Sequence, residues 1–414
     1  MININLIREN PEIVKAGMEK KLADPALIDK FLKIDEEWRG LKKVTDDLRA
    51  AQKNLGAESR DEARKIKEEI VANDDKIKVL SEERDFIVSQ IPNLPDDDVP
   101  VGKDDSENPV FKTVGEPVKF GFAPKDYVDL AGWMIDTDRA SKIAGSRFGY
   151  IMKDIAELEF ALLRFGMDTL IPHGFRLTLP PVMIKSDVYR RVGKGQFIDA
   201  GDAFYVSEDD LYLVGSSEHS MAPMYMDETV DVSKPIRLLG FSTCFRREAG
   251  TYGKDTRGIL RVHQFNKLEM YSICKPEDSK AEHEFLLARQ EELMSKLGIP
   301  YRIVRNCTGD MGFGDANQYD IEAWIPSQNK YRETHSCSNT TDYQARGLNI
   351  TYKVRGDDGK DKNEFVHTLN ATAFSERPLL AILENFQKED GRITVPDVLR
   401  KYFGKDEIII SEGK

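Results

Sequence analysis

A chain of 414 residues is long enough for two or three domains. Hydrophobic residues make up 40% of it, but no apolar run approaches the length of a membrane-spanning helix, which argues against a membrane protein. The formal net charge of -12 argues against non-specific nucleic-acid binding, so any contact with a nucleic acid requires a local basic patch.

The cysteines are far apart in the sequence and include no Cys-x-x-Cys pair. We therefore expect neither a disulfide framework nor a protein zinc site. The N-terminus also lacks a basic start followed by an apolar block, as a secretion signal would have. These features favour a reducing, cytoplasmic location. The cysteines are Cys244, Cys274, Cys307 and Cys337.

The N-terminal region reads as helical. A short helix is predicted from Pro11 to Lys21 with Asn10 as its cap. Apolar residues then recur at alternating steps of four and three from Leu27 to Leu55, and again from Ile66 to Ile91. This is a heptad pattern. With a turn at 56–59, it predicts an antiparallel coiled-coil arm at about 27–91, within an N-terminal domain of residues 1–100.

The far half of this arm is basic. Residues 39–67 contain nine Lys or Arg against five acidic residues, in an otherwise acidic chain. A basic tip indicates a phosphate backbone as partner. The alternative is an ordinary solvated coiled-coil face of mixed charge.

The remainder reads as a second, α+β domain. Residues 101–117 are predicted to be a linker because this stretch is rich in Pro, Asp and Gly, and residues 118–414 form the second domain. Strands and helices mix there without a βαβ rhythm, which predicts an antiparallel sheet flanked by helices. No dinucleotide-binding glycine motif or phosphate-binding P-loop is present. The predicted helices are 158–170, 282–297 and 379–387, and the predicted strands are 176–183, 204–205, 211–214, 301–304, 319–325 and 349–354.

The stretch from Leu239 to Tyr271 is predicted to be a hairpin with charged faces. Alternation places Cys244 and Arg246 on one face of the first strand, and Phe265, Lys267 and Glu269 on one face of the second. Its connection is longer than a usual hairpin loop, which favours a functional flap. A solvated edge hairpin is the alternative, and the pattern alone does not separate the two.

Several motifs resemble those of class II aminoacyl-tRNA synthetases, in particular the seryl-tRNA synthetases of bacterial type. Phe245-Arg-Arg-Glu248 with the downstream 261–269 resembles motif 2, and Gly174 to Pro181 resembles motif 1. Asn370 to Arg377 resembles motif 3, and the arm ending in Ile-Pro-Asn-Leu-Pro at 91–95 is similar to the arm of this family. The resemblance runs from Met1 to about Gly404.

The resemblance implies that the chain activates L-serine with ATP and transfers it to the 3′ end of a tRNA. An Arg suits the charge that develops on the α-phosphate because its planar fork binds phosphate oxygens in pairs. Arg246 and Arg377 are the implied catalytic residues, and Glu333 is the implied contact to a magnesium ion bound with ATP. The implied ATP-binding residues are Arg246, Arg247, Glu248, Val262, Phe265, Glu333, Thr334, His335, Ser336 and Arg377.

Recognition of serine requires groups that would be left without a partner if the hydroxyl were absent. The residues that match the family's serine site are Ser216, Ser217, Glu218, Arg246, Glu269 and Thr372. The resemblance further implies a homodimer and tRNA(Ser) as partner, and it leaves open whether tRNA(Sec) is also a substrate. The candidate tRNA contacts on the arm are Arg49, Lys53, Arg60 and Arg64.

Two other functions remain under consideration. One is a ligase that attaches an activated amino acid to a carrier protein, although such relatives lack the long arm. The other is a non-catalytic RNA-binding paralogue, which would be expected to lose motif residues that this chain keeps. Serine-dependent exchange between ATP and pyrophosphate would separate these from a synthetase.

Overall fold

The computed structural model describes residues 1–55, 60–249, 253, 255, 257–356 and 359–409. The chain divides into two compact units, Met1–Leu94 and Pro95–Lys414. The stretch predicted to be a linker, 101–117, lies wholly in the second unit. It includes the short η1 (Asp105–Glu107) and the strand β1 (Val110–Val114), which pairs with β10 of the main sheet.

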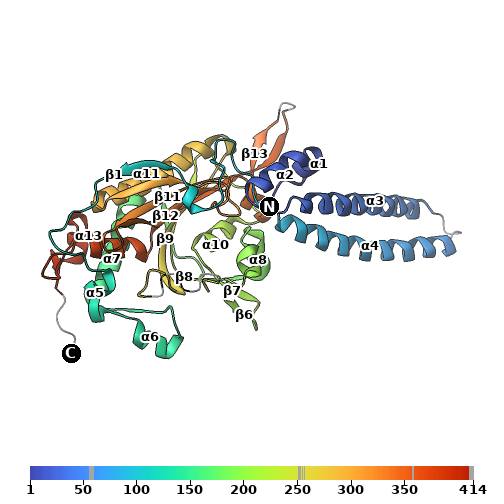
Figure 1. Ribbon diagram of the computed structural model, residues 1–414. Helices are drawn as coiled ribbons and strands as arrows, with labels where there is room; N and C mark the ends of the chain where they lie inside the picture. Colours follow the sequence, from blue (N-terminus) through green and yellow to red (C-terminus); the bar gives the residue numbers. More distant parts are fainter. Residues whose placement is uncertain (56–59, 250–252, 254, 256, 357–358, 410–414) are drawn as a thin grey trace. The chain divides into compact units, whose positions relative to one another are not determined.

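The first unit consists of helices (Figure 1). The helices α1 (Ile4–Glu9) and α2 (Pro11–Lys20) precede the long α3 (Ala26–Asn54) and α4 (Arg60–Ser89). The predicted coiled-coil arm is confirmed by α3 and α4, which lie side by side as a helical pair (Figure 1). The turn predicted at 56–59 lies outside the described residues. The apolar face at the base of the arm includes Ile28, Phe31 and Ile87, each almost completely buried.

One buried carboxylate joins three segments of this unit. Asp35 on α3 is fully buried and accepts two hydrogen bonds from Arg8 of α1, at 2.8 and 2.7 Å. Arg39, one helical turn on, donates to it at 2.9 Å, and Arg84 of α4 lies 3.5 Å away. The three arginines compensate for taking the carboxylate out of water.

The second unit is built on a large sheet. Within the described residues, eight strands follow the order β1-β10-β11-β12-β15-β9-β8-β4, and only β4 and β8 pair in parallel. After β1, their bounds in this order are Tyr301–Arg305, Asn317–Ile325, Lys330–Asn339, His367–Phe374, Gln264–Cys274, Ile236–Phe245 and Arg176–Thr178. The predicted class of an antiparallel sheet with helices is confirmed.

Helices pack against this sheet and supply its core. Leu158, Leu286 and Leu379 represent three of them and are all buried in the same apolar cluster as Leu268 of β9. In the described part of the chain, no helix is both long and apolar enough to cross a membrane. The helices that pack against the main sheet are α5 (Tyr127–Ala131), α7 (Lys153–Leu170), α11 (Ser279–Leu297), α13 (Glu376–Asn385) and α14 (Asp397–Phe403).

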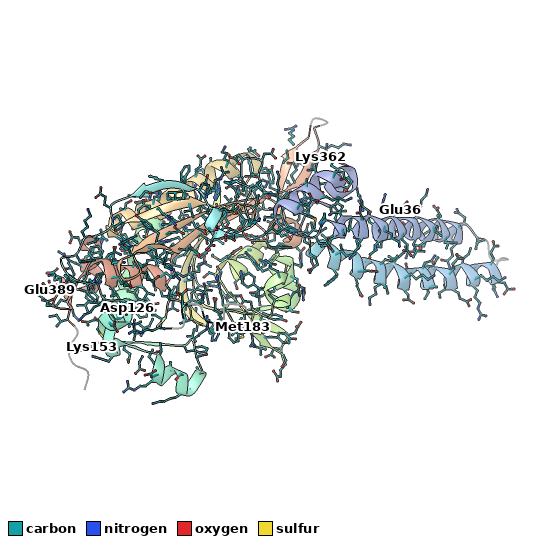
Figure 2. The ribbon with its side chains drawn as sticks, in the orientation of Figure 1. Glu36, Asp126, Lys153, Met183, Lys362 and Glu389 are labelled. Carbon is teal, nitrogen blue, oxygen red and sulfur yellow. The ribbon has the colours of Figure 1, made fainter. Side chains whose placement is uncertain are left out.

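Smaller elements surround the main sheet. A three-stranded sheet contains β5 (Met183–Lys185), β6 (Tyr205–Val206) and β7 (Leu211–Leu213), and Met183 is labelled in Figure 2. The other strand pairs are β2 (Ile135–Asp136) with β3 (Tyr150–Ile151), β13 (Thr351–Arg355) with β14 (Asp361–Phe365), and β16 (Ile393–Thr394) with β17 (Glu407–Ile408). The remaining α-helices are α6 (Thr137–Ala144), α8 (Ser186–Arg191), α9 (Gly195–Asp199), α10 (Glu218–Met221) and α12 (Tyr343–Leu348).

Two predictions need correction. The strand predicted at 176–183 is wrong beyond Thr178: the chain leaves the main sheet there, and Met183 begins β5 of another sheet. Pro180 and Pro181 have no backbone N–H to donate, so a continuous strand could not be paired through them. The alternative that Leu239–Tyr271 forms a solvated hairpin at the edge of a sheet is also wrong. Both of its strands are internal, because β8 lies between β4 and β9, and β9 lies between β15 and β8.

Candidate active site

A cavity of about 380 Å³ opens where the ends of β8 and β9 meet β12 and the junction of β15 with α13. Most of the predicted nucleotide residues line it. The predicted site residues on its wall are Arg246, Glu248, Val262, Phe265, Glu333, Thr334, Ser336, Thr372 and Arg377. The lining also includes residues that no motif singled out as site residues, namely Phe197, Asp202, Ala249, Leu260, Ser375 and Glu376.

Arg246 follows directly after the end of β8. Its backbone N–H donates to the carbonyl of His263 at 3.0 Å, and its side-chain Nε donates to the carbonyl of Gly215 at 3.0 Å. The guanidinium carbon lies 5.4 Å from the centre of the Phe265 ring. With Nε engaged, the rest of the guanidinium can bind a phosphate on the cavity side.

Phe265 lies opposite Cys244 in the β8–β9 register and is only partly buried. One part of the ring packs against the main core, and the residue also lines the cavity. The arrangement therefore combines a core contact with an apolar surface on which a flat base could stack.

Glu248 is held by an ion pair within the motif 2 region. Arg261 donates to its carboxylate at 2.6 Å, and Glu248 has a φ of 54°, in the left-handed region that a non-glycine residue rarely adopts. Asp202 stabilises this turn because its carboxylate accepts the backbone N–H of Ala249 at 2.9 Å. Asp202 was missed because no motif includes it.

A bulge in β12 explains how adjacent residues face the cavity. Ile321 pairs with His335 and Glu322 pairs with Glu333, so Thr334 is an extra residue in the ladder. Glu333, Thr334 and Ser336 consequently all line the cavity, which strict alternation would forbid. Sequence periodicity alone could not reveal this shift.

His335 lies beneath the cavity wall. It is almost completely buried, and its ring nitrogens contact the carbonyl of Ala373 at 3.1 Å and the Thr334 hydroxyl at 2.8 Å. Burial lowers the pKa of His335 to about 3, so the ring is neutral near pH 7. It is not among the cavity-lining residues, and its assignment to ATP stays a prediction.

Arg247 points toward a different neighbour from Arg246. Its Nε donates to the carbonyl of Ala203 at 3.3 Å and its guanidinium lies 4.5 Å from the centre of the Phe204 ring. It does not line the cavity. Its role in ATP binding therefore stays a prediction without support from the position of its side chain.

The residues predicted to bind the substrate serine gather beside the cavity. Thr372 of β15 pairs directly with Glu269 of β9, and Lys267 lies 2.7 Å from the Glu269 carboxylate. Lys267 also contacts the Ser216 hydroxyl at 3.4 Å and lines the cavity, which links the two groups. Burial raises the pKa of Glu269 although Lys267 acts in the opposite direction.

Two further residues predicted to bind serine, Ser217 and Glu218, lie at the start of α10. Ser217 hydrogen-bonds Ser242 of β8 at 2.8 Å, and this close approach depends on Gly240, where a Cβ would lie 2.9 Å from Ser217. Glu218 is buried and accepts a hydrogen bond from Gln344 of α12 at 2.6 Å. Ser216, Ser217, Glu218 and Glu269 do not line the cavity itself but form a polar layer next to it.

The candidate tRNA residues lie on the arm and differ in their pairing. Arg49 reaches from α3 to Asp74 of α4, with an ion pair at 2.7 Å. Arg64 pairs with Glu68 at 3.1 Å on its own helix. Lys53 and Arg60 are exposed close to the end of the arm. All four lie on the surface, and Arg49 also contributes to the contact between the two helices.

One carboxylate suits a magnesium ion that accompanies ATP. Glu333 lines the cavity, and its side chain is half-exposed there. Magnesium is usually held by one or two carboxylates together with substrate phosphates, so a single acid is sufficient. Among the described residues, no group of three or more His, Cys, Asp or Glu is close enough together to hold a metal ion.

Known proteins are similar to this chain along its whole length. Residues 1–95 match the family described as the seryl-tRNA synthetase N-terminal domain, and residues 204–386 match the tRNA synthetase class II core domain (G, H, P, S and T). The chain is 42% identical to a serine–tRNA ligase of Thermoplasma volcanium, over 98% of each chain. It is 40% identical to a serine–tRNA ligase of Dictyoglomus turgidum, over 99% of each.

A solved structure has the same fold throughout. The seryl-tRNA synthetase of Pyrococcus horikoshii, determined in complex with ATP, superimposes with a TM-score of 0.91 at 39% identity. The match covers 100% of both chains. The similarity therefore includes the helical arm as well as the domain that contains the cavity.

Proposed function

Because this chain belongs to the family of seryl-tRNA synthetases, we infer that it is a serine–tRNA ligase. It activates L-serine with ATP to seryl-adenylate and then transfers the seryl group to the 3′ end of tRNA(Ser). The observation that supports this inference most directly is the gathering of motif 2, β12 and motif 3 residues around one cavity beside Glu269 and Thr372.

The first step is a displacement at phosphorus. An oxygen of the serine carboxylate attacks the α-phosphate of ATP, the bond to the β-phosphate oxygen breaks, and pyrophosphate leaves. We assign Arg246 and Arg377 to the phosphate oxygens on which negative charge develops. Phe265 stacks on the adenine, and Glu248 binds near the base. A magnesium ion at Glu333 would neutralise part of the phosphate charge.

In the second step, a ribose hydroxyl at the 3′ end of the tRNA attacks the carbonyl carbon of seryl-adenylate. The ester bond forms, and AMP leaves with the phosphate oxygen. Glu218, Glu269 and Thr372 are assigned to the ammonium and hydroxyl of serine. Their burial supports discrimination, because a substrate without the hydroxyl would leave buried polar groups without a partner.

Exchange of labelled pyrophosphate into ATP tests the first step. Exchange should require L-serine and should not occur with L-alanine. Charging of tRNA(Ser) tests the second step, and the same assay with tRNA(Sec) tests that RNA as a further substrate. A chain that binds tRNA(Ser) without any serine-dependent exchange would contradict the proposal and would favour a non-catalytic RNA-binding protein.

The arm is assigned to the tRNA. Its exposed basic residues near the end, Lys53, Arg60 and Arg64, support this role. Reversing their charge together should reduce charging and leave serine-dependent exchange intact, because exchange does not involve RNA. Reversing Lys76 and Lys78, two exposed residues further from the tip, serves as a matched control.

We also propose that the enzyme is a homodimer. The motif 1 strand β4 ends the main sheet, and Leu177 and Leu179 at this edge are 46% and 75% exposed. Exposed apolar residues at a sheet edge favour a partner. Sedimentation should give twice the mass of one chain, and Leu179→Asp should shift the equilibrium toward the monomer. A monomer at all concentrations would exclude the dimer.

Two finer assignments complete the proposal. Within the family we assign the chain to the bacterial type, although the similar chains come from archaea as well as bacteria. We assign it to the cytoplasm, and its four cysteines, which are free and buried, agree with a reducing compartment.

A further inference from the structure

Lys194 places a buried ammonium group against the predicted serine site. The residue lies between α8 and α9, and its Nζ is 3.2 Å from Oε1 of Glu218. Only 15% of the Lys194 side chain and 5% of the Glu218 side chain are exposed. A lysine is rarely buried to this extent unless a carboxylate compensates for the lost water. No motif of the sequence drew attention to this residue.

Gln344 contacts the same carboxylate oxygen. Its Nε2 donates to Oε1 of Glu218 at 2.6 Å. The orientation of its amide is determined by two hydroxyls, because Tyr271 and Thr368 each donate to its Oε1 at 3.0 Å. Lys194 and Gln344 thus both approach Oε1 of Glu218, from two separate elements.

We propose that Lys194 is a positioning residue for the amino-acid substrate: with Gln344 it holds Glu218 by Oε1, which directs Oε2 toward the ammonium group of serine. This inference rests on the proposed function, since it needs Glu218 to accept that ammonium. Lys194 itself does not touch the substrate. It would act by keeping the carboxylate in one orientation and in its charged form.

The charge of Glu218 depends on this contact. Burial raises the pKa of Glu218, but the neighbouring groups, with Lys194 the strongest, together lower it to about 2. His219 is not an alternative source of positive charge near pH 7, because burial lowers its own pKa to about 3. Lys267 is already close to Glu269. The titratable groups that face Glu218 are Lys194, His219, Lys267, Glu269, Tyr189 and Tyr271. Asp315 and Arg246 also act on Lys194, the first raising and the second lowering its pKa.

The sign of the pH effect follows from these contacts. Without Lys194, the burial that raises the pKa of Glu218 loses its strongest opposing group. The pKa of Glu218 therefore rises, and a protonated carboxyl at low pH cannot pair with an ammonium. Raising the pH restores its charge. A variant that lacks the ammonium should therefore bind serine poorly at low pH and recover as the pH rises, whereas the wild type should show no such recovery.

The test is serine-dependent pyrophosphate exchange with Lys194→Met and Lys194→Arg, between about pH 6 and about pH 8.5. Lys194→Met should raise the KM for serine by about tenfold or more at pH 6.5, leave the KM for ATP within about twofold, and recover at higher pH. Lys194→Arg should retain most of the affinity for serine. Lys185→Met, at an exposed lysine of the same region, should behave as the wild type.

Two results would overturn the inference. One is a serine KM of Lys194→Met equal to that of the wild type, and the other is an equal, pH-independent rise in the KM for both substrates. Thermal unfolding shows whether the variant is folded, and Lys194→Gln, which retains a polar side chain, replaces it if it is not. Absence of exchange in the wild type would instead contradict the proposed function.

Discussion

Arg377, in the first turn of α13, donates from Nη1 to Glu333 of β12 twice: to its carboxylate and to its backbone carbonyl, at 3.1 Å each. Desolvation raises the pKa of Glu333, but Arg377 lowers it and the net direction is downward. The arrangement joins the motif 3 arginine to the acidic segment across the cavity wall. It positions a guanidinium next to a carboxylate that remains half-exposed.

Replacing Arg377 by Ala should remove both contacts and a phosphate-binding group. We expect pyrophosphate exchange to fall by about 100- to 1,000-fold. Arg377→Lys should recover little, because a lysine cannot reproduce the planar fork. Arg392→Ala, at a partly exposed arginine of a surface ion pair, is the control and should retain activity. Near-normal exchange by Arg377→Ala would remove this residue from the catalytic assignment.

Arg246→Ala should lower pyrophosphate exchange by a factor similar to that for Arg377→Ala, without unfolding the protein. The Nε of Arg246 donates one hydrogen bond, to the carbonyl of Gly215. Loss of this bond should lower the free energy of unfolding by about 1 kcal/mol. Exchange kinetics and thermal unfolding on the same sample would separate the two effects. Activity lost in proportion to folded protein would contradict a role in phosphate binding.

Phe265→Ala should weaken ATP binding with little effect on serine. A base stacked on an aromatic ring contributes about 1–3 kcal/mol, so the KM for ATP should rise by about five- to 160-fold. Phe265→Tyr should retain most of the affinity because the ring is kept. Phe86→Ala, at a phenylalanine that is 60% exposed on α4, is a suitable control for exchange. A larger change in the KM for serine than for ATP would disagree with stacking.

Asp35→Asn should destabilise the helical unit. It leaves Arg8 and Arg84 without their buried partner and should cost about 3 kcal/mol near pH 7. Burial raises the pKa of Asp35, but the arginines lower it by more, so the pKa in the folded state lies below the usual value of an aspartate. Its stabilisation is therefore present above the unfolded pKa and is lost as the pH falls through the folded pKa. Hydrogen exchange of α3 and α4 should show wild type and variant converging in acid.

Glu376→Gln should change how stability depends on pH. Burial raises the pKa of Glu376 from 4.5 to about 7, with Arg377 acting in the opposite direction. The folded state then binds the proton more tightly, so stability should fall as the pH rises from the unfolded pKa to about 7. The stability of the variant should not show this fall with pH. At about pH 8 its free energy of unfolding should exceed that of the wild type by up to about 3 kcal/mol. Identical pH profiles of thermal unfolding would exclude this effect.

Some features could be predicted from local sequence because their cause is local. The steps of four and three from Leu27 to Leu55 specify a helix with one apolar stripe, and α3 forms there. The alternation along 264–274 places Phe265, Lys267 and Glu269 on one face, and the register of β9 against β8 agrees. Both patterns depend only on the repeat of a helix or strand.

Other features depend on contacts between distant segments. The strand β15 was missed because its residues, from His367 to Phe374, have no alternation when both faces are buried. Likewise, the bulge at Thr334 depends on pairing with β11, which periodicity within β12 cannot show. Both errors concern elements in the middle of the sheet.

The sequence by itself determined the helical arm, the α+β second domain, and the arginines and carboxylates that resemble a synthetase. These follow from residue types and short-range repeats. Only the tertiary structure decided that Arg377 meets Glu333 and that Lys194 is buried against Glu218. The residues of each pair are separated by more than twenty positions, and only the packing of the sheet and its surrounding helices brings them within hydrogen-bond or ion-pair distance.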